Sequence, residues 1–314
     1  MSSITFLVGL FAIGLAGFAT QRGNICTVVA MEQVVNERRS TRLVSMLEAT
    51  LWVSAGLLAL ASAGRLSFVP HGYRAAALTA LGGALFGAGA IINGACAFGS
   101  VARLGSGDLA YVATPVGFLA GISGLHHGYS PASTSATAPL LSLHAPVAIL
   151  VALVLVSSAS IRLWRRGRKQ IEQEHARWPS YVASAVIGLS FLTATVSFDR
   201  WTYMDFPGDL TQHGGRQTLL GLLLLAVLLA GAVLGGYVGR ELALIRPTVA
   251  GVARCLAGGA VMGVAAGLIP GGNAALVLAE MPLLWPFAWL AFASLCAAVL
   301  VAVLMKHSFL RLPA

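Results

Sequence analysis

The stretch "FATQRGNICTVVAMEQVV", residues 18–35, holds an apolar helix end, a polar interruption and a second, shorter apolar segment. A glycine and Asn24 in the interruption favour a helix break, because glycine adopts left-handed conformations and asparagine caps helix N-termini. We expect Asn24 to cap a short second helix whose N–H groups point toward Cys26, with Gln21 and Arg22 close by. Taken alone, the stretch could also be a water-facing loop in which the cysteine is a small apolar filler.

A second stretch repeats this pattern at residues 91–104, "IINGACAFGSVARL". Asn93 and a glycine again end an apolar segment, and Cys96 begins another. Glycine-rich spans are explained by close helix packing, but packing does not explain two cysteines at matching helix breaks. The pair of motifs therefore favours a pathway lined by Cys26 and Cys96.

The composition indicates an all-α integral membrane protein. The chain has 314 residues, of which 57% are hydrophobic and 10% charged, and its mean hydropathy is +0.83. Soluble domains carry roughly a quarter charged residues. The net charge of +9 is explained by cytoplasmic loops and anionic lipid, so we expect no nucleic-acid partner. The four cysteines and seven histidines show no zinc or iron–sulfur spacing, so we expect neither a metal nor a cofactor.

Apolar length predicts about nine transmembrane helices, since a span needs about 20 apolar residues. The predicted spans are 4–20, 43–63, 75–93, 108–126, 144–163, 180–197, 217–238, 249–269 and 283–305. Three shorter apolar segments, 24–35, 96–104 and 271–280, are expected to be re-entrant helices. Glu48, Asp108 and Glu280 lie near span ends and no carboxylate lies in mid-span, which favours a channel-like path.

The distribution of basic residues predicts the orientation. Residues 162–178, "RLWRRGRKQIEQEHARW", form the most basic segment, and we place them in the cytoplasm. Of the 20 Lys and Arg residues, nine alternating spans then leave four outside: Arg65, Arg74, Arg200 and Arg216. The N-terminus is therefore expected outside and the C-terminus in the cytoplasm.

Two weak internal matches predict two inverted repeats. Residues 82–95 resemble 258–271 at an offset of 176, and 13–20 resemble 187–194 at an offset of 174. We expect a first repeat over 1–143, a linking span with the basic loop over 144–179, and a second repeat over 180–314. The first repeat holds spans one to four and the second holds spans six to nine. Because the fifth span joins them, the two repeats have opposite orientations in the membrane, an architecture common in transporters.

The second repeat should carry a third helix break at "IPGGNAALVLAEMP", residues 269–282. Asn273 is expected to cap a short helix over 274–280 and to face the same pathway. No cysteine stands at this break. Cys255 and Cys296 lie inside apolar spans, where ordinary core packing is expected.

The motifs "QRGNIC" and "NGACAFG", in glycine-rich spans arranged as two inverted units, resemble the YeeE/YedE sulphur-transport family over nearly the whole chain. The resemblance implies an hourglass-shaped pathway in which cysteines at helix breaks pass thiosulfate along by S–H hydrogen bonds. Cys26 and Cys96 match the first two such positions. The third falls on Gly272 and Asn273, a departure that bears on the substrate more than on the fold.

These observations predict a transporter in the inner (plasma) membrane, and not an enzyme, that imports thiosulfate or a closely related sulfur ion. A cytoplasmic sulfur-accepting protein is a candidate partner. The expected pathway residues are Cys26, Cys96, Gln21, Arg22, Asn24, Asn93 and Asn273. Two alternatives stay open: a membrane redox or sulfur-transfer protein that uses the two cysteines as a thiol pair, and a transporter for a different small anion.

Overall fold

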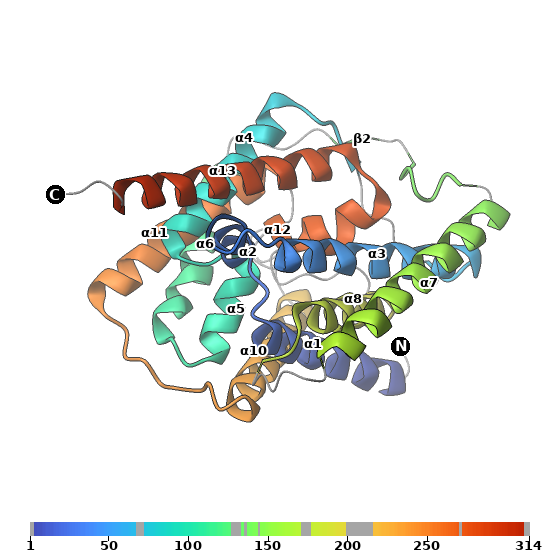
Figure 1. The fold of residues 1–314 in the computed structure, drawn as a ribbon, viewed down its shortest axis with the longest axis horizontal. Helices are drawn as coiled ribbons and strands as arrows, with labels where there is room; N and C mark the ends of the chain where they lie inside the picture. Colours follow the sequence, from blue (N-terminus) through green and yellow to red (C-terminus); the bar gives the residue numbers. More distant parts are fainter. Residues whose placement is uncertain are drawn as a thin grey trace.

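The computed structural model of the chain describes residues 3–66, 72–126, 133–134, 137–143, 145–170, 177–198, 216–269 and 272–310. Within these residues the chain is almost entirely helical (Figure 1). A single antiparallel strand pair is present among them, in which β1 (Gly72–Tyr73) lies beside β2 (Ser133–Thr134).

A long helix lies over each of the nine predicted spans. These helices are α1 (Ser3–Gly23), α3 (Thr41–Ser62), α4 (Ala77–Asn93), α6 (Ala113–His126), α7 (Ala145–Gln170), α8 (Ser180–Phe198), α10 (Arg216–Val238), α11 (Val249–Leu268) and α13 (Pro286–Leu310). By length and composition, seven helical stretches in the described part of the chain can cross a membrane. α6, with 14 residues, and α7 are not among the seven, so the nine-span topology stays a prediction.

Short helices follow the three predicted breaks. They are α2 (Thr27–Asn36), α5 (Ala97–Gly105) and α12 (Gly272–Ala275). The last continues as the π-helical turn η2 (Leu276–Glu280) and the 3-10 turn η3 (Met281–Leu283), and a further 3-10 turn, η1 (Leu109–Val112), precedes α6. Their re-entrant character stays a prediction, since length and composition alone do not give depth in the bilayer.

The helices that carry the predicted repeat segments pack against each other in pairs. α1 lies along α8, and α4 lies along α11 (Figure 1). Close approach depends on glycine in both pairs: a Cβ on Gly258 would lie 2.5 Å from the backbone N of Asn93, and one on Gly9 would lie 2.5 Å from the Cβ of Ser197. The main buried core surrounds α2, α4, α5, α11 and α13, and it therefore encloses the helix breaks.

Two details differ from the sequence-based expectation. The predicted cytoplasmic loop is helical as far as Gln170, because α7 extends beyond its apolar part, and Arg162 pairs with Glu48 of α3 at 3.5 Å. Glu280, expected near a span end, is fully buried in η2. Both carboxylates thus lie within the helical packing.

Candidate functional site

The break between α1 and α2 is built around Asn24. Its φ is +46°, in the left-handed region that asparagine tolerates better than most residues. The Asn24 N–H donates to the carbonyl of Gln21 at 3.1 Å, and the N–H of Ile25 donates to that of Thr20 at 3.3 Å. This hydrogen-bond pair closes the C-terminus of α1. The predicted N-cap role of Asn24 is therefore wrong, and Cys26, in an extended conformation, is the N-cap of α2.

The break between α4 and α5 is held by Asn93. Gly94 turns the chain with φ at +80°, and Cys96 is the N-cap of α5. The buried amide Nδ2 of Asn93 donates to the carbonyl of Ala95 at 2.7 Å and to Ser100 Oγ at 2.9 Å, while its Oδ1 accepts from the Thr114 hydroxyl at 2.8 Å. All polar atoms of this side chain are therefore engaged. These contacts hold the break that carries Cys96, and a role for Asn93 in the pathway stays a prediction.

The two breaks meet at their cysteines. The backbone N–H of Cys96 donates to Cys26 Sγ at 3.5 Å, and the N–H of Thr27 donates to Cys96 Sγ at 3.2 Å. Each thiol thus lies at the N-terminus of the other's helix, where free N–H groups carry partial positive charge. Both cysteines are buried, with exposed fractions of 3% and 0%. Gly99 permits this approach, because a Cβ there would lie 2.6 Å from Cys26 Sγ.

Asn273 joins the two cysteines from the second half of the chain. Its Nδ2 lies 3.5 Å from the Thr27 hydroxyl, and its side chain is completely buried. Its Oδ1 has no hydrogen-bond partner among the described residues. Asn273 lies inside α12, after the left-handed Gly272, and not before the helix as predicted. We call Cys26, Thr27, Cys96 and Asn273 the thiol junction.

Gln21 and Arg22 lie in a different cluster. The amide of Gln21 donates to Ser106 Oγ at 3.3 Å and to Glu241 Oε2 at 3.1 Å. Arg22 packs closely against Gly239, and its carbonyl accepts from the N–H of Trp178 at 3.0 Å. Glu241 and Gly239 lie just beyond the end of α10, whereas Ser106 follows α5 and Trp178 precedes α8, so both residues join the end of α1 to neighbouring helices.

The remaining cysteines do not lie at a break. Cys255 is fully buried in α11 within the main core, and Cys296 is partly buried in α13. Their positions agree with the expected packing role. In the described part of the chain, no group of three or more His, Cys, Asp or Glu could hold a metal ion.

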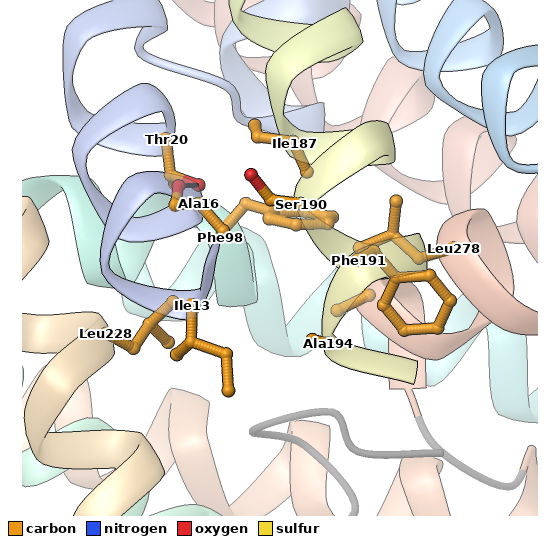
Figure 2. Close-up of a pocket in the computed structure, with 11 residues that line it drawn as sticks. Ile13, Ala16, Thr20, Phe98, Ile187, Ser190, Phe191, Ala194, Leu228 and Leu278 are labelled. Carbon is orange, nitrogen blue, oxygen red and sulfur yellow. Dashed lines mark hydrogen bonds between the residues drawn. The ribbon is translucent and has the colours of Figure 1, made fainter. Parts of the chain in front are cut away.

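An apolar cavity of about 40 Å³ approaches the thiol junction from the side of α1 and α8. Figure 2 shows Thr20 of α1, Phe98 of α5 and Ser190 of α8 around it, with Leu228 of α10 and Leu278 of η2 completing the wall. Phe98 is two residues beyond Cys96, and the lining residue Ala274 follows Asn273 directly. The cavity has room for about one water molecule, whose share of liquid volume is about 30 Å³.

Thr27 and Gly99 are site residues that the sequence analysis missed. Thr27 supplies the amide on Cys96 and the hydroxyl beside Asn273, and Gly99 makes room for Cys26 Sγ. Thr27 follows Cys26 directly at the start of a predicted helix, and this position could have indicated that its N–H group is free to bind the site. The role of Gly99 depends on a contact between α2 and α5 and leaves no local signal.

A family model described as sulphur transport matches residues 22–301, which is most of the chain. The protein therefore belongs to the sulphur transport family, as the resemblance predicted. Over 105 residues the chain is 33% identical to the thiosulfate transporter TsuA of Escherichia coli (strain K12). That match covers 32% of this chain and 28% of TsuA, so the substrate of that relative becomes a hypothesis for this chain.

Proposed function

We propose that the protein imports thiosulfate, or a closely related small sulfur-containing ion, across the inner membrane by way of the thiol junction. Family membership and the likeness to TsuA support a sulfur anion as the substrate. The observation that carries the pathway is the reciprocal contact between two buried cysteines at two helix N-termini. In this proposal the N-terminus is outside, the C-terminus is cytoplasmic, and the two halves form inverted repeats.

The donors at the thiol junction suit a thiosulfate dianion. Its terminal sulfur is soft and weakly hydrated, so weak S–H donors can replace water there without holding the ion tightly. Helix N-termini add a moderate positive potential through their N–H groups. Conduction needs sites that are favourable enough to enter and weak enough to leave. Two thiols and backbone N–H groups meet that requirement.

Passage requires the thiol junction to open. Both cysteines are buried, and the apolar cavity beside them is smaller than a hydrated anion. In this mechanism, the arriving anion replaces the two sulfurs as the acceptor for the N–H groups of Thr27 and Cys96. The thiols are then released to donate to the terminal sulfur. Asn273, whose Oδ1 has no described partner, turns its amide N–H toward the ion in place of the family's third cysteine.

Uptake of labelled thiosulfate by cells that lack their own thiosulfate transporter tests this function. Cys26→Ala and Cys96→Ala should each reduce uptake to background at an unchanged membrane level of the protein. Cys255→Ala is the matched control, because that cysteine is equally buried but lies outside the thiol junction. Full uptake by both junction variants, or loss in the control alone, would contradict the proposed pathway.

The substrate is tested by competition. Excess unlabelled thiosulfate should abolish uptake, whereas sulfate and sulfite should compete weakly if the soft terminal sulfur is recognised. Equal competition by all three would favour a transporter for a different small anion.

A membrane redox or sulfur-transfer protein is the second candidate. The adjacency of the two sulfurs favours it, since two neighbouring thiols can form a disulfide or hold a persulfide. Mass spectrometry of the protein after exposure to thiosulfate separates the two functions. A transporter keeps both thiols unmodified during uptake. A sulfur-transfer protein instead takes the outer sulfur of thiosulfate onto Cys26 or Cys96 as a persulfide, releases sulfite, and passes the persulfide sulfur to a cytoplasmic acceptor.

A further inference from the structure

A second cavity, of about 320 Å³, lies at the end of α1 beside the first helix break. Its lining includes three arginines, Arg39, Arg42 and Arg177, together with Gly23 and Thr41. None of the described residues that line it is acidic. We call this the arginine cavity. Gly23 is three residues before Cys26, so the cavity adjoins the break that carries the first thiol.

Two of its arginines are held in place by neighbouring groups. Arg42 donates from one guanidinium nitrogen to the carbonyl of Asn24 at 3.1 Å, and its backbone N–H donates to Gln33 Oε1 at 3.2 Å. The Arg177 Nε pairs with Glu241 at 2.6 Å. Each contact engages one nitrogen, whereas a guanidinium has five N–H donors. Both side chains therefore keep donors for a further acceptor.

The electrostatics of the cavity favour an anion. Arg177 and Arg42 are close enough to repel each other, while Glu37 attracts Arg42 and Glu241 pairs with Arg177, so two carboxylates offset part of the charge of the three arginines. Basic residues on a cytoplasmic surface are ordinarily spread over solvated loops, where they need no partner. Here three of them converge on one hollow, and Arg42 is half-buried and anchored to the backbone of the helix break. A dianion between them would relieve the repulsion and accept paired hydrogen bonds.

We infer that the arginine cavity is a binding site for a small oxyanion, occupied by the transported ion after it leaves Cys26. The site itself stands on its own geometry, and only the identity of the ion rests on the proposed function. The predicted topology places the cavity on the cytoplasmic side, where an imported anion leaves. A lipid phosphate group has the same chemistry and is the competing occupant.

A reporter cysteine tests the site without transport. Thr41→Cys places a thiol on an exposed position of the lining, and its labelling by a negatively charged methanethiosulfonate is measured in neutral phosphatidylcholine nanodiscs. Sulfate is the probe, because it is a stable dianion that does not react with the label, and chloride at equal ionic strength controls for screening. The chain without the reporter gives the background from native cysteines. Sulfate should slow labelling of the reporter well beyond chloride.

Arginine variants identify the groups responsible. Arg39→Gln and Arg177→Gln, in the reporter background, should each weaken the protection by sulfate about tenfold, a factor that corresponds to about 1.4 kcal/mol. Arg165→Gln is the matched control, since it removes an exposed charge from α7 that does not line the cavity. Equal protection in all variants, or none by sulfate beyond chloride, would overturn the site.

Two further arms separate the occupants and the two proposals. If nanodiscs that contain phosphatidylglycerol abolish the effect of sulfate, a lipid headgroup holds the cavity and the inference of a free anion is wrong. Cys96→Ala should abolish thiosulfate uptake but leave the protection by sulfate intact. If Cys96→Ala keeps both thiosulfate uptake and protection by sulfate, the thiol pathway alone is rejected. If uptake depends on Cys96 as expected but sulfate gives no protection of the reporter, the arginine site alone is rejected.

Discussion

Replacing Asn273 by aspartate places a negative charge at the thiol junction with almost no change of shape. The side chain is fully buried, and its Nδ2 lies 3.5 Å from the Thr27 hydroxyl. The N–H of the same threonine donates to Cys96 Sγ at 3.2 Å. Asn273→Asp therefore replaces an N–H donor by a carboxylate oxygen. Only Thr27 separates this oxygen from Cys96, which the anion must pass in the proposed mechanism.

Coulomb's law gives the size of the effect. The two contacts add up to about 7 Å. At that separation, and at an effective dielectric constant of about 20, two unit charges repel by about 2.4 kcal/mol. A dianion meets about twice that repulsion, about 4.7 kcal/mol, which corresponds to a roughly 3,000-fold loss of occupancy. Thiosulfate uptake by Asn273→Asp should therefore fall to background.

The assay is labelled thiosulfate uptake at pH 8, where the new carboxylate is favoured in its ionised form, normalised to folded protein in the membrane. Asn273→Ser is the control, because it is polar but neutral and should keep much of the uptake. Near-normal uptake by folded Asn273→Asp would show that Asn273 lies off the path. The second half of the chain would then contribute only structure to the site.

Three further predictions concern packing and topology. Gly99→Ala should push Cys26 aside, lower the stability by about 1–3 kcal/mol and impair uptake, as measured by thermal denaturation in detergent and by the uptake assay. Gly124→Ala is the control, because a Cβ there meets open space, and it should change neither stability nor uptake. Asn93→Ala should leave its buried partners unpaired, which lowers the stability by about 1–3 kcal/mol and the yield of folded protein. The apparent KM for thiosulfate of the protein that folds should be unchanged. A raised KM would place this amide in the path. A tag at the N-terminus should be accessible from outside and one within 165–175 from the cytoplasm, and tags on the same side would contradict the inverted repeats.

The positions of the helix breaks were predictable from local residue chemistry. Glycine and asparagine beside apolar runs mark where helices end, and Asn24 and Gly94 do take left-handed conformations there. The assignment of the caps was less predictable, because the same asparagine can end one helix or begin the next. Here Asn24 ends α1, and the guanidinium of Arg42 binds its carbonyl from 18 residues away, a contact that the local sequence does not reveal.

The sequence by itself determined the class of protein and the positions of the breaks. A chain with 10% charged residues and repeated apolar runs cannot cover itself with polar surface, so a membrane location follows from composition alone. Only the tertiary structure decided which of the polar residues at those breaks share a site. Cys26 meets Cys96 across 70 residues, and Asn273 reaches Thr27 across 246, while Gln21 and Arg22 turn to residues just beyond α10 instead. Local propensity sets where a helix stops, but contacts between separate helices depend on how their faces pack, which no single stretch of the chain encodes.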